Sequence, residues 1–115
     1  MEIGIDIEKN ERFKNMIDSH LEKIFTKNEI LYCKKFADYE AHFCAFWCVK
    51  EAFVKATSNK SISFLNIEIT HTENGKPEII KNQFIENTLN SVNCKNIKIS
   101  LSHSKEYSTA VCLVY

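Results

Sequence analysis

Apolar residues recur along this chain with two different periods, which predict where its strands and helices lie. Isoleucine at every second position of 3–7 predicts a short strand, with Asp6 on the face opposite the isoleucines. Similar alternation predicts strands over 63–70, 97–102 and 109–115. The turn sequence at 73–76 makes 77–80 the expected hairpin partner of 63–70.

Helical spacing of apolar residues predicts further elements between these strands. One helix is expected over 10–23 and another over 83–92. Thr26 and Glu29 have the spacing of a capping box, so a short helix should begin directly after Thr26.

The longest predicted helix follows Asp38, its expected N-cap, and runs to about Thr57. Its apolar side chains nearly surround the axis, which is typical of a helix at the centre of a core. Lys50, Glu51 and Lys55 are the charged exceptions. Charge on a core helix is costly unless it is paired or coordinates a ligand.

The order of these elements predicts the fold class. A strand, then helices, then mostly antiparallel strands is typical of an α+β domain. We expect one small domain over 1–115, with a mostly antiparallel sheet wrapped around the long apolar helix.

Composition narrows the function classes. The formal net charge is zero, so nucleic acid and membrane are not expected partners. The N-terminus carries an acid where a signal peptide needs an apolar run, so a cytoplasmic location is expected.

Two of the five cysteines could share a helix face and bind a metal, but four-ligand zinc spacing is absent. We expect buried free thiols at Cys33, Cys44, Cys48, Cys94 and Cys112.

The charged residues of the central helix are the first candidates for chemistry. Glu51 and Lys55 share one helix face, where an exposed ion pair would contribute only a few tenths of a kcal/mol. Asp6 could equally be a solvated carboxylate of an edge strand, and His103 a surface histidine at a turn. Carboxylates from two separate elements also suit Mg²⁺. Spacing alone leaves these alternatives open.

Four segments, taken in order, resemble holo-acyl-carrier-protein synthase, the short single-module type of phosphopantetheinyl transferase. The most specific is the run Lys-Glu-Ala-x-x-Lys-Ala that begins at Lys50, and the next is the Gly-x-Asp that ends at Asp6. The others are Asn-Gly-Lys-Pro, ending at Pro77, and Ser-Leu-Ser-His, ending at His103. Together these segments span nearly the whole chain.

The resemblance implies transfer of 4'-phosphopantetheine from coenzyme A to a serine of an acyl carrier protein. It assigns Asp6 and Glu51 as Mg²⁺ ligands and Lys55 as the lysine facing the phosphates, and it makes all three catalytic. Glu51 is the candidate general base. A homotrimer with active sites between subunits is also implied.

The resemblance further implies two binding regions. Arg12 and Met16 are expected to contact the carrier protein. Coenzyme A is expected to contact Lys55, Asn74, Gly75, Lys76, Pro77, Ser102 and His103. Ser58 and Lys60 are further expected contacts, as side-chain donors in place of the glycines that the family usually has in their loop.

The chain departs from the family's pattern at three places. Phe46-Trp47 stands where Arg-Phe is frequent, and the loop at 57–61 lacks the usual glycines. Lys9 replaces a frequent glutamate, and Glu8 is a candidate substitute for it. These departures leave two alternatives to an enzyme: a non-catalytic module that binds coenzyme A or carrier protein, and a structural domain without ligand.

Overall fold

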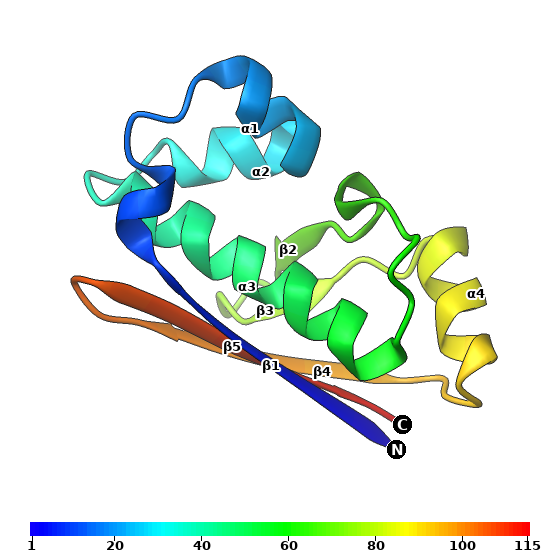
Figure 1. Cartoon of the computed structure of the whole chain (residues 1–115). Helices are drawn as coiled ribbons and strands as arrows, with labels where there is room; N and C mark the ends of the chain where they lie inside the picture. The colour runs from blue at the N-terminus through cyan, green and yellow to red at the C-terminus, as the bar shows by residue number, and fades with distance from the viewer.

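Helix α3 (Tyr39–Thr57) is the central element of the computed structural model, which describes residues 1–115 (Figure 1). Most of its side chains are buried, including those of Phe43, Val49 and Phe53. The prediction of a core helix is therefore confirmed. Asp38 occupies the N-cap position, but its side chain makes no capping hydrogen bond.

A three-stranded antiparallel sheet packs one face against α3. Its strands are β1 (Glu2–Lys9), β5 (Tyr107–Val114) and β4 (Ile97–His103), in the order β1-β5-β4. Figure 1 shows all the helices on the α3 side of this sheet. The predicted α+β architecture is confirmed, although the strands divide between this sheet and a separate hairpin.

Gly4 lets β1 approach α3 more closely than any other residue would. A Cβ atom added at Gly4 would lie 2.0 Å from the carbonyl oxygen of Ala52 and 2.7 Å from the backbone nitrogen of Ala56. Such distances are far inside van der Waals contact. The small residues on both elements therefore set how closely Asp6 of β1 approaches the charged residues of α3.

The hairpin consists of β2 (Ile69–His71) and β3 (Pro77–Ile79). Gly75 in its turn has a positive φ of 81°, which glycine adopts without steric cost. The predicted strand over 63–70 is wrong for most of its length, because residues Phe64–Asn66 form the 3-10 helix η2. The Ser63 side chain accepts a hydrogen bond from the backbone N–H of Leu65 at 3.3 Å, which favours a turn over a strand.

The predicted helix over 10–23 is also wrong, because the chain breaks into the 3-10 helix η1 (Asn10–Phe13) and the short helix α1 (Asp18–Ile24). Asn15 between them has a φ of 62°. This left-handed conformation ends a right-handed helix, and asparagine is among the few residues that tolerate it.

The remaining helices agree with the sequence. Helix α2 (Lys27–Cys33) begins with the predicted capping box of Thr26 and Glu29. Helix α4 (Gln83–Ser91) follows Asn82, whose side chain accepts a hydrogen bond from the backbone N–H of Ile85 at 3.0 Å.

Two further findings concern the cysteines and the apolar character of the helices. All five cysteines are buried and unpaired, as predicted. None of the helices combines the length and apolar character needed to cross a membrane.

Candidate active site

Asp6 and Lys55 join strand β1 to helix α3 through one ion pair. Lys55 Nζ donates to Asp6 Oδ1 at 3.0 Å and to the backbone oxygen of Ile5 at 3.0 Å. The alternative in which Lys55 pairs with Glu51 along the helix is not observed. Lys55 instead crosses to the strand and leaves the Glu51 carboxylate without an ionic partner.

Glu51 has an unusual electrostatic environment for a carboxylate near the surface. Partial burial and the nearby charge of Asp6 raise the pKa of Glu51, in that order of size. The positive charges of Lys55 and Arg12 oppose this rise without cancelling it. The carboxylates of Asp6 and Glu51 therefore repel each other across the gap between β1 and α3.

A pocket of 530 Å³ opens beside Glu51 and Lys55. Lys60 adds a second ammonium group to its wall, so an anionic ligand is favoured. Val54 and Phe64 supply the apolar wall, and neither was predicted as a site residue. Val54 could have been found from its position one helical turn after Glu51, on the same face.

The loop after α3 adopts a backbone conformation that glycine normally provides. Ser58 ends the helix with a φ of 56° and lines the pocket. The Asn59 side chain is occupied elsewhere, because it donates to Thr88 Oγ1 at 2.9 Å and accepts from Ser61 Oγ at 2.8 Å. Of the polar residues in this loop, Ser58 and Lys60 line the pocket, whereas Asn59 holds the loop in place through these side-chain hydrogen bonds.

The donor atoms at this site fit a divalent cation. Asp6 and Glu51 offer hard oxygen ligands from two elements, as Mg²⁺ sites commonly do. The Glu51 carboxylate lacks an ionic partner, and the mutual repulsion of the two carboxylates is the kind that a cation relieves.

Glu8 lies on the same side of β1 as Asp6, but it is already paired. Its Oε2 accepts a bond from Arg12 at 2.8 Å, and its Oε1 accepts one from the Lys9 backbone N–H at 2.8 Å. The pKa of Glu8 is lowered, first by the Lys9 hydrogen bond and then by Arg12. A role for Glu8 as a third metal ligand stays a prediction.

Arg12 pairs with Glu8 and also contacts an aromatic side chain of α3. Its guanidinium carbon sits 4.2 Å from the ring centre of Trp47, close enough for a cation–π contact. Met16 is partly buried and packs against the core. Arg12 remains exposed and its positive charge lowers the pKa of Glu51, so the predicted carrier-binding residue is close to the Glu51 carboxylate.

Phe46 explains one departure from the family's pattern. Its ring is buried and stacks on Tyr32, with centroids 5.6 Å apart and an interplanar angle of 9°. His71 of the hairpin stacks on the other ring of this pair, Tyr32, at 4.3 Å. The place of a frequent arginine is thus taken by an aromatic stack that joins α2, α3 and β2.

The other predicted coenzyme A residues lie away from this pocket. His103 is the last residue of β4 and lies beside the N-terminal end of α3. Its ring centre is 5.2 Å from that of His42. His42 precedes Glu51 by about 13 Å of helix at the usual rise per residue. Ser102 is exposed on β4 and points to the face opposite His103, because side chains alternate along a strand.

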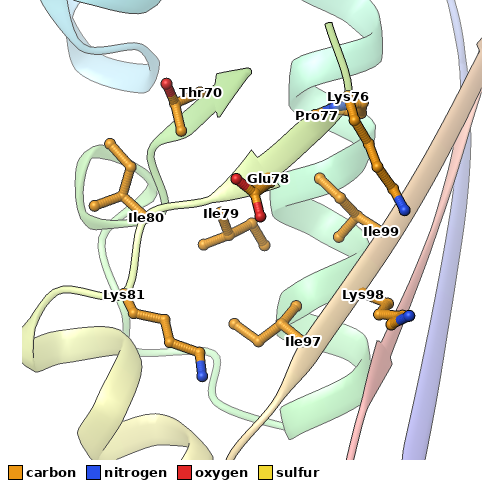
Figure 2. Close-up of a pocket in the computed structure, with 10 residues that line it drawn as sticks. All are labelled: Thr70, Lys76, Pro77, Glu78, Ile79, Ile80, Lys81, Ile97, Lys98 and Ile99. Carbon is orange, nitrogen blue, oxygen red and sulfur yellow. The ribbon is translucent and has the colours of Figure 1, made fainter. Parts of the chain in front are cut away.

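The turn residues Lys76 and Pro77 line a different pocket, of 520 Å³, between the hairpin and β4 (Figure 2). Lys81 and Lys98 add two more ammonium groups around its isoleucine side chains. Asn74 and Gly75 are exposed in the adjoining turn. Within one chain the predicted residues therefore form separate groups rather than one continuous site.

Comparisons with known proteins identify the family of this chain. The family model for the 4'-phosphopantetheinyl transferase superfamily matches residues 2–112. The holo-[acyl-carrier-protein] synthase of Aquifex aeolicus (strain VF5) is 35% identical over 120 residues, which cover 97% of this chain and 96% of that protein. Fatty acid synthase subunit alpha of Lachancea kluyveri is 33% identical over 115 residues, which cover 96% of this chain but 6% of the subunit.

A solved structure is similar over the same range. The holo-(acyl-carrier-protein) synthase from Bacillus anthracis str. Ames, in complex with CoA (3',5'-ADP), has a TM-score of 0.80 and 30% sequence identity. The match covers 98% of this chain and 94% of that one. The chain thus spans nearly all of the separate synthases that it matches and a small part of the much longer fatty acid synthase subunits.

Proposed function

The chain belongs to the 4'-phosphopantetheinyl transferase superfamily, and from this premise we propose that it is a holo-[acyl-carrier-protein] synthase. It transfers the 4'-phosphopantetheine group of coenzyme A to a serine of an apo acyl carrier protein and releases 3',5'-ADP. The observation that carries the proposal is the meeting of Asp6, Glu51 and Lys55 beside a pocket with a cationic wall. The carrier belongs to fatty-acid synthesis or a related pathway.

The reaction exchanges one phosphorus–oxygen bond for another. The serine hydroxyl oxygen of the carrier bonds to the β-phosphorus of coenzyme A. The bond from that phosphorus to the bridging oxygen breaks, and the electron pair leaves with 3',5'-ADP. Lys55 offsets the negative charge that grows on the phosphate oxygens, which is where such catalysis gains most of its power.

Glu51 is the candidate base for the serine proton. In the chain without metal, the raised pKa of Glu51 makes it a stronger base than an ordinary glutamate. Asp6 keeps Lys55 in place through the 3.0 Å ion pair. Asp6 and Glu51 would hold Mg²⁺, which when bound supplies charge neutralisation to the pyrophosphate oxygens.

A homotrimer would unite the separate groups of coenzyme A residues. The outer face of β1 exposes Ile3, Ile5 and Ile7 at 67%, 64% and 64% of their surfaces. Neighbouring β5 adds apolar residues with the same orientation, including Val111 and Leu113. Contiguous apolar surface of this kind is typical of protein interfaces. In a trimer, the nucleotide end of coenzyme A would contact His103, Ser102 and the 74–77 turn of a second copy.

Two further parts of the proposal concern the partner and the location. Arg12 and Met16 would contact an acidic helix of the carrier, because Arg12 is exposed and lies close enough to influence Glu51. The buried, unpaired thiols support a cytoplasmic location.

Mass spectrometry of the carrier tests the proposal. Purified chain is incubated with apo acyl carrier protein, coenzyme A and Mg²⁺, and the carrier should gain the mass of one phosphopantetheine group. A known synthase serves as the positive control for carrier and reagents. Coenzyme A binding by calorimetry without a mass gain on several carriers would contradict the proposal and favour the non-catalytic binding module.

A further inference from the structure

Three side chains that could ligate a metal converge at the N-terminal end of α3, away from Glu51. They are Asp38 before the helix, His42 in its first turns and His103 at the end of β4. One ligand atom from each lies within 4.8 Å of the other two. The contact between His42 Nε2 and Asp38 Oδ1 measures 3.3 Å.

His42 is the fixed member of this group. Its imidazole stacks on Phe36 with ring centroids 3.7 Å apart and an interplanar angle of 11°. Asp38 and His103 are both exposed, so their side chains are free to rotate. Ligand atoms around a tetrahedral zinc ion lie roughly 3.4 Å apart, given metal–ligand bonds of about 2.1 Å. His42 and Asp38 already have that spacing at 3.3 Å, so rotation of the exposed His103 toward this pair is the change that the site requires.

The donor set selects a different metal from the one expected at Asp6 and Glu51. Two imidazole nitrogens and one carboxylate oxygen are the ligands of many zinc centres that keep a water in the fourth position. Imidazole also suits other late first-row divalent ions, whereas Mg²⁺ prefers oxygen ligands. The chain therefore presents one all-oxygen site and one mixed nitrogen–oxygen site.

We propose that Asp38, His42 and His103 bind a divalent transition metal ion of the Zn²⁺ class. Water is the fourth ligand. The bound ion would link the N-terminal end of α3, through Asp38 and His42, to the end of β4, through His103. These two segments are far apart in the sequence. Binding of the ion needs neither coenzyme A nor a carrier, although His103 is also one of the residues proposed to contact the nucleotide end of coenzyme A in a second copy.

Calorimetric titration of the full chain with ZnCl₂ tests the site. Excess Mg²⁺ is present so that the Asp6–Glu51 carboxylates do not contribute. The wild-type chain should bind one Zn²⁺, and His42→Gln and His103→Gln should each weaken binding at least tenfold. His103 is exposed, so its variant stays informative even if His42→Gln lowers the stability of the fold.

Two matched variants and a spectrum test whether the ion binds at this cluster rather than at His20, Glu51 or a cysteine. His20→Gln, which removes an exposed histidine on α1, and Glu51→Gln should both bind Zn²⁺ as the wild type does. Titration with Co²⁺ should give visible absorption without a thiolate charge-transfer band, because no cysteine is a ligand. The proposal is overturned if the wild type binds no Zn²⁺, if both histidine variants bind it as tightly as the wild type, or if the thiolate band appears.

Discussion

Lys50 and Lys55 lie on the same helix, yet they serve opposite purposes. Lys50 is fully buried and donates to Glu29 Oε1 at 2.7 Å, to the Phe64 oxygen at 2.8 Å and to the Ile24 oxygen at 3.0 Å. Lys55 is half exposed and shares one pair with Asp6 at the rim of an open pocket. Lys50 holds surrounding segments to the core, whereas Lys55 faces the candidate ligand site.

The carboxylates beside these lysines differ in the same way. Glu29 accepts bonds at both oxygens, from Lys50 and the Thr26 backbone at Oε1 and from the Ile69 backbone at Oε2. Glu51 has no ionic partner and a raised pKa. A buried carboxylate with hydrogen bonds to both oxygens indicates a structural role. A carboxylate at a pocket with a raised pKa and no ionic partner indicates a functional role.

Removal of the buried lysine should have the largest effect on stability. We expect Lys50→Met to lower the free energy of unfolding by about 3–5 kcal/mol, because it leaves Glu29 buried without its cation. Lys55→Met, at an exposed pair, should cost about 0–1 kcal/mol. Urea unfolding measures both.

A double variant sharpens this comparison. Lys50→Met combined with Glu29→Gln should recover part of the loss, because no buried charge is then unpaired. Equal destabilisation by Lys50→Met and Lys55→Met would contradict the distinction between the two lysines.

Substitution at the open site should affect turnover instead. Glu51→Gln should reduce the transfer rate by about 10²–10⁴, the usual contribution of a positioned general base. Stability should be unchanged or higher, because the charge of Glu51 is disfavoured in the fold. The carrier mass-shift assay gives the rate, and Glu22→Gln, an exposed change on α1, is the control. Full activity of Glu51→Gln would rule out its catalytic role.

The raised pKa of Glu51 also predicts a pH dependence. A carboxyl group whose folded pKa is raised stabilises the fold below its unfolded pKa and loses that contribution as the pH rises through the folded pKa. Glu51→Gln should therefore gain stability relative to wild type as the pH increases. Melting curves at several pH values measure the difference, and the opposite slope would contradict it.

The smallest expected effect concerns the loop after α3. Ser58 has a left-handed φ of 56°, so Ser58→Gly should stabilise the fold by about 0.5–1 kcal/mol. Lys60 lacks a positive φ, so Lys60→Gly should instead lower stability, or leave it unchanged. Denaturant unfolding compares the two variants. A loss of stability in Ser58→Gly would show that the serine side chain outweighs the backbone strain.

Local patterns in the sequence predicted the central helix, the capping box at Thr26 and most strands. Two predictions failed where a single residue redirected the backbone, at Asn15 and at Ser63. No local pattern indicates that Glu29 serves twice, as part of the capping box and as the partner of Lys50. That pairing depends on how α2 packs against α3.

The candidate site was only partly predictable for the same reason. Helical spacing put Glu51 and Lys55 on one face, but the choice of Asp6 as the partner of Lys55 depends on the close approach of β1 at Gly4. Family resemblance supplied Asp6 before the packing was known. The aromatic stack at Phe46 and the cluster around His42 were missed, because both join segments that are far apart in the sequence.

The central claim is that Glu51 lowers the stability of the free chain but is needed to bind Mg²⁺ with coenzyme A. Thermal melting of wild type and Glu51→Gln, each with and without Mg²⁺ and coenzyme A, tests this claim most directly. Without ligands, Glu51→Gln should melt at the same temperature as wild type or above it. With coenzyme A present, Mg²⁺ should raise the melting temperature of wild type and leave that of Glu51→Gln unchanged, because only a ligand of the native state stabilises it. A variant that melts well below wild type, or that keeps the full rise with Mg²⁺, would contradict the assignment of Glu51 as a functional carboxylate.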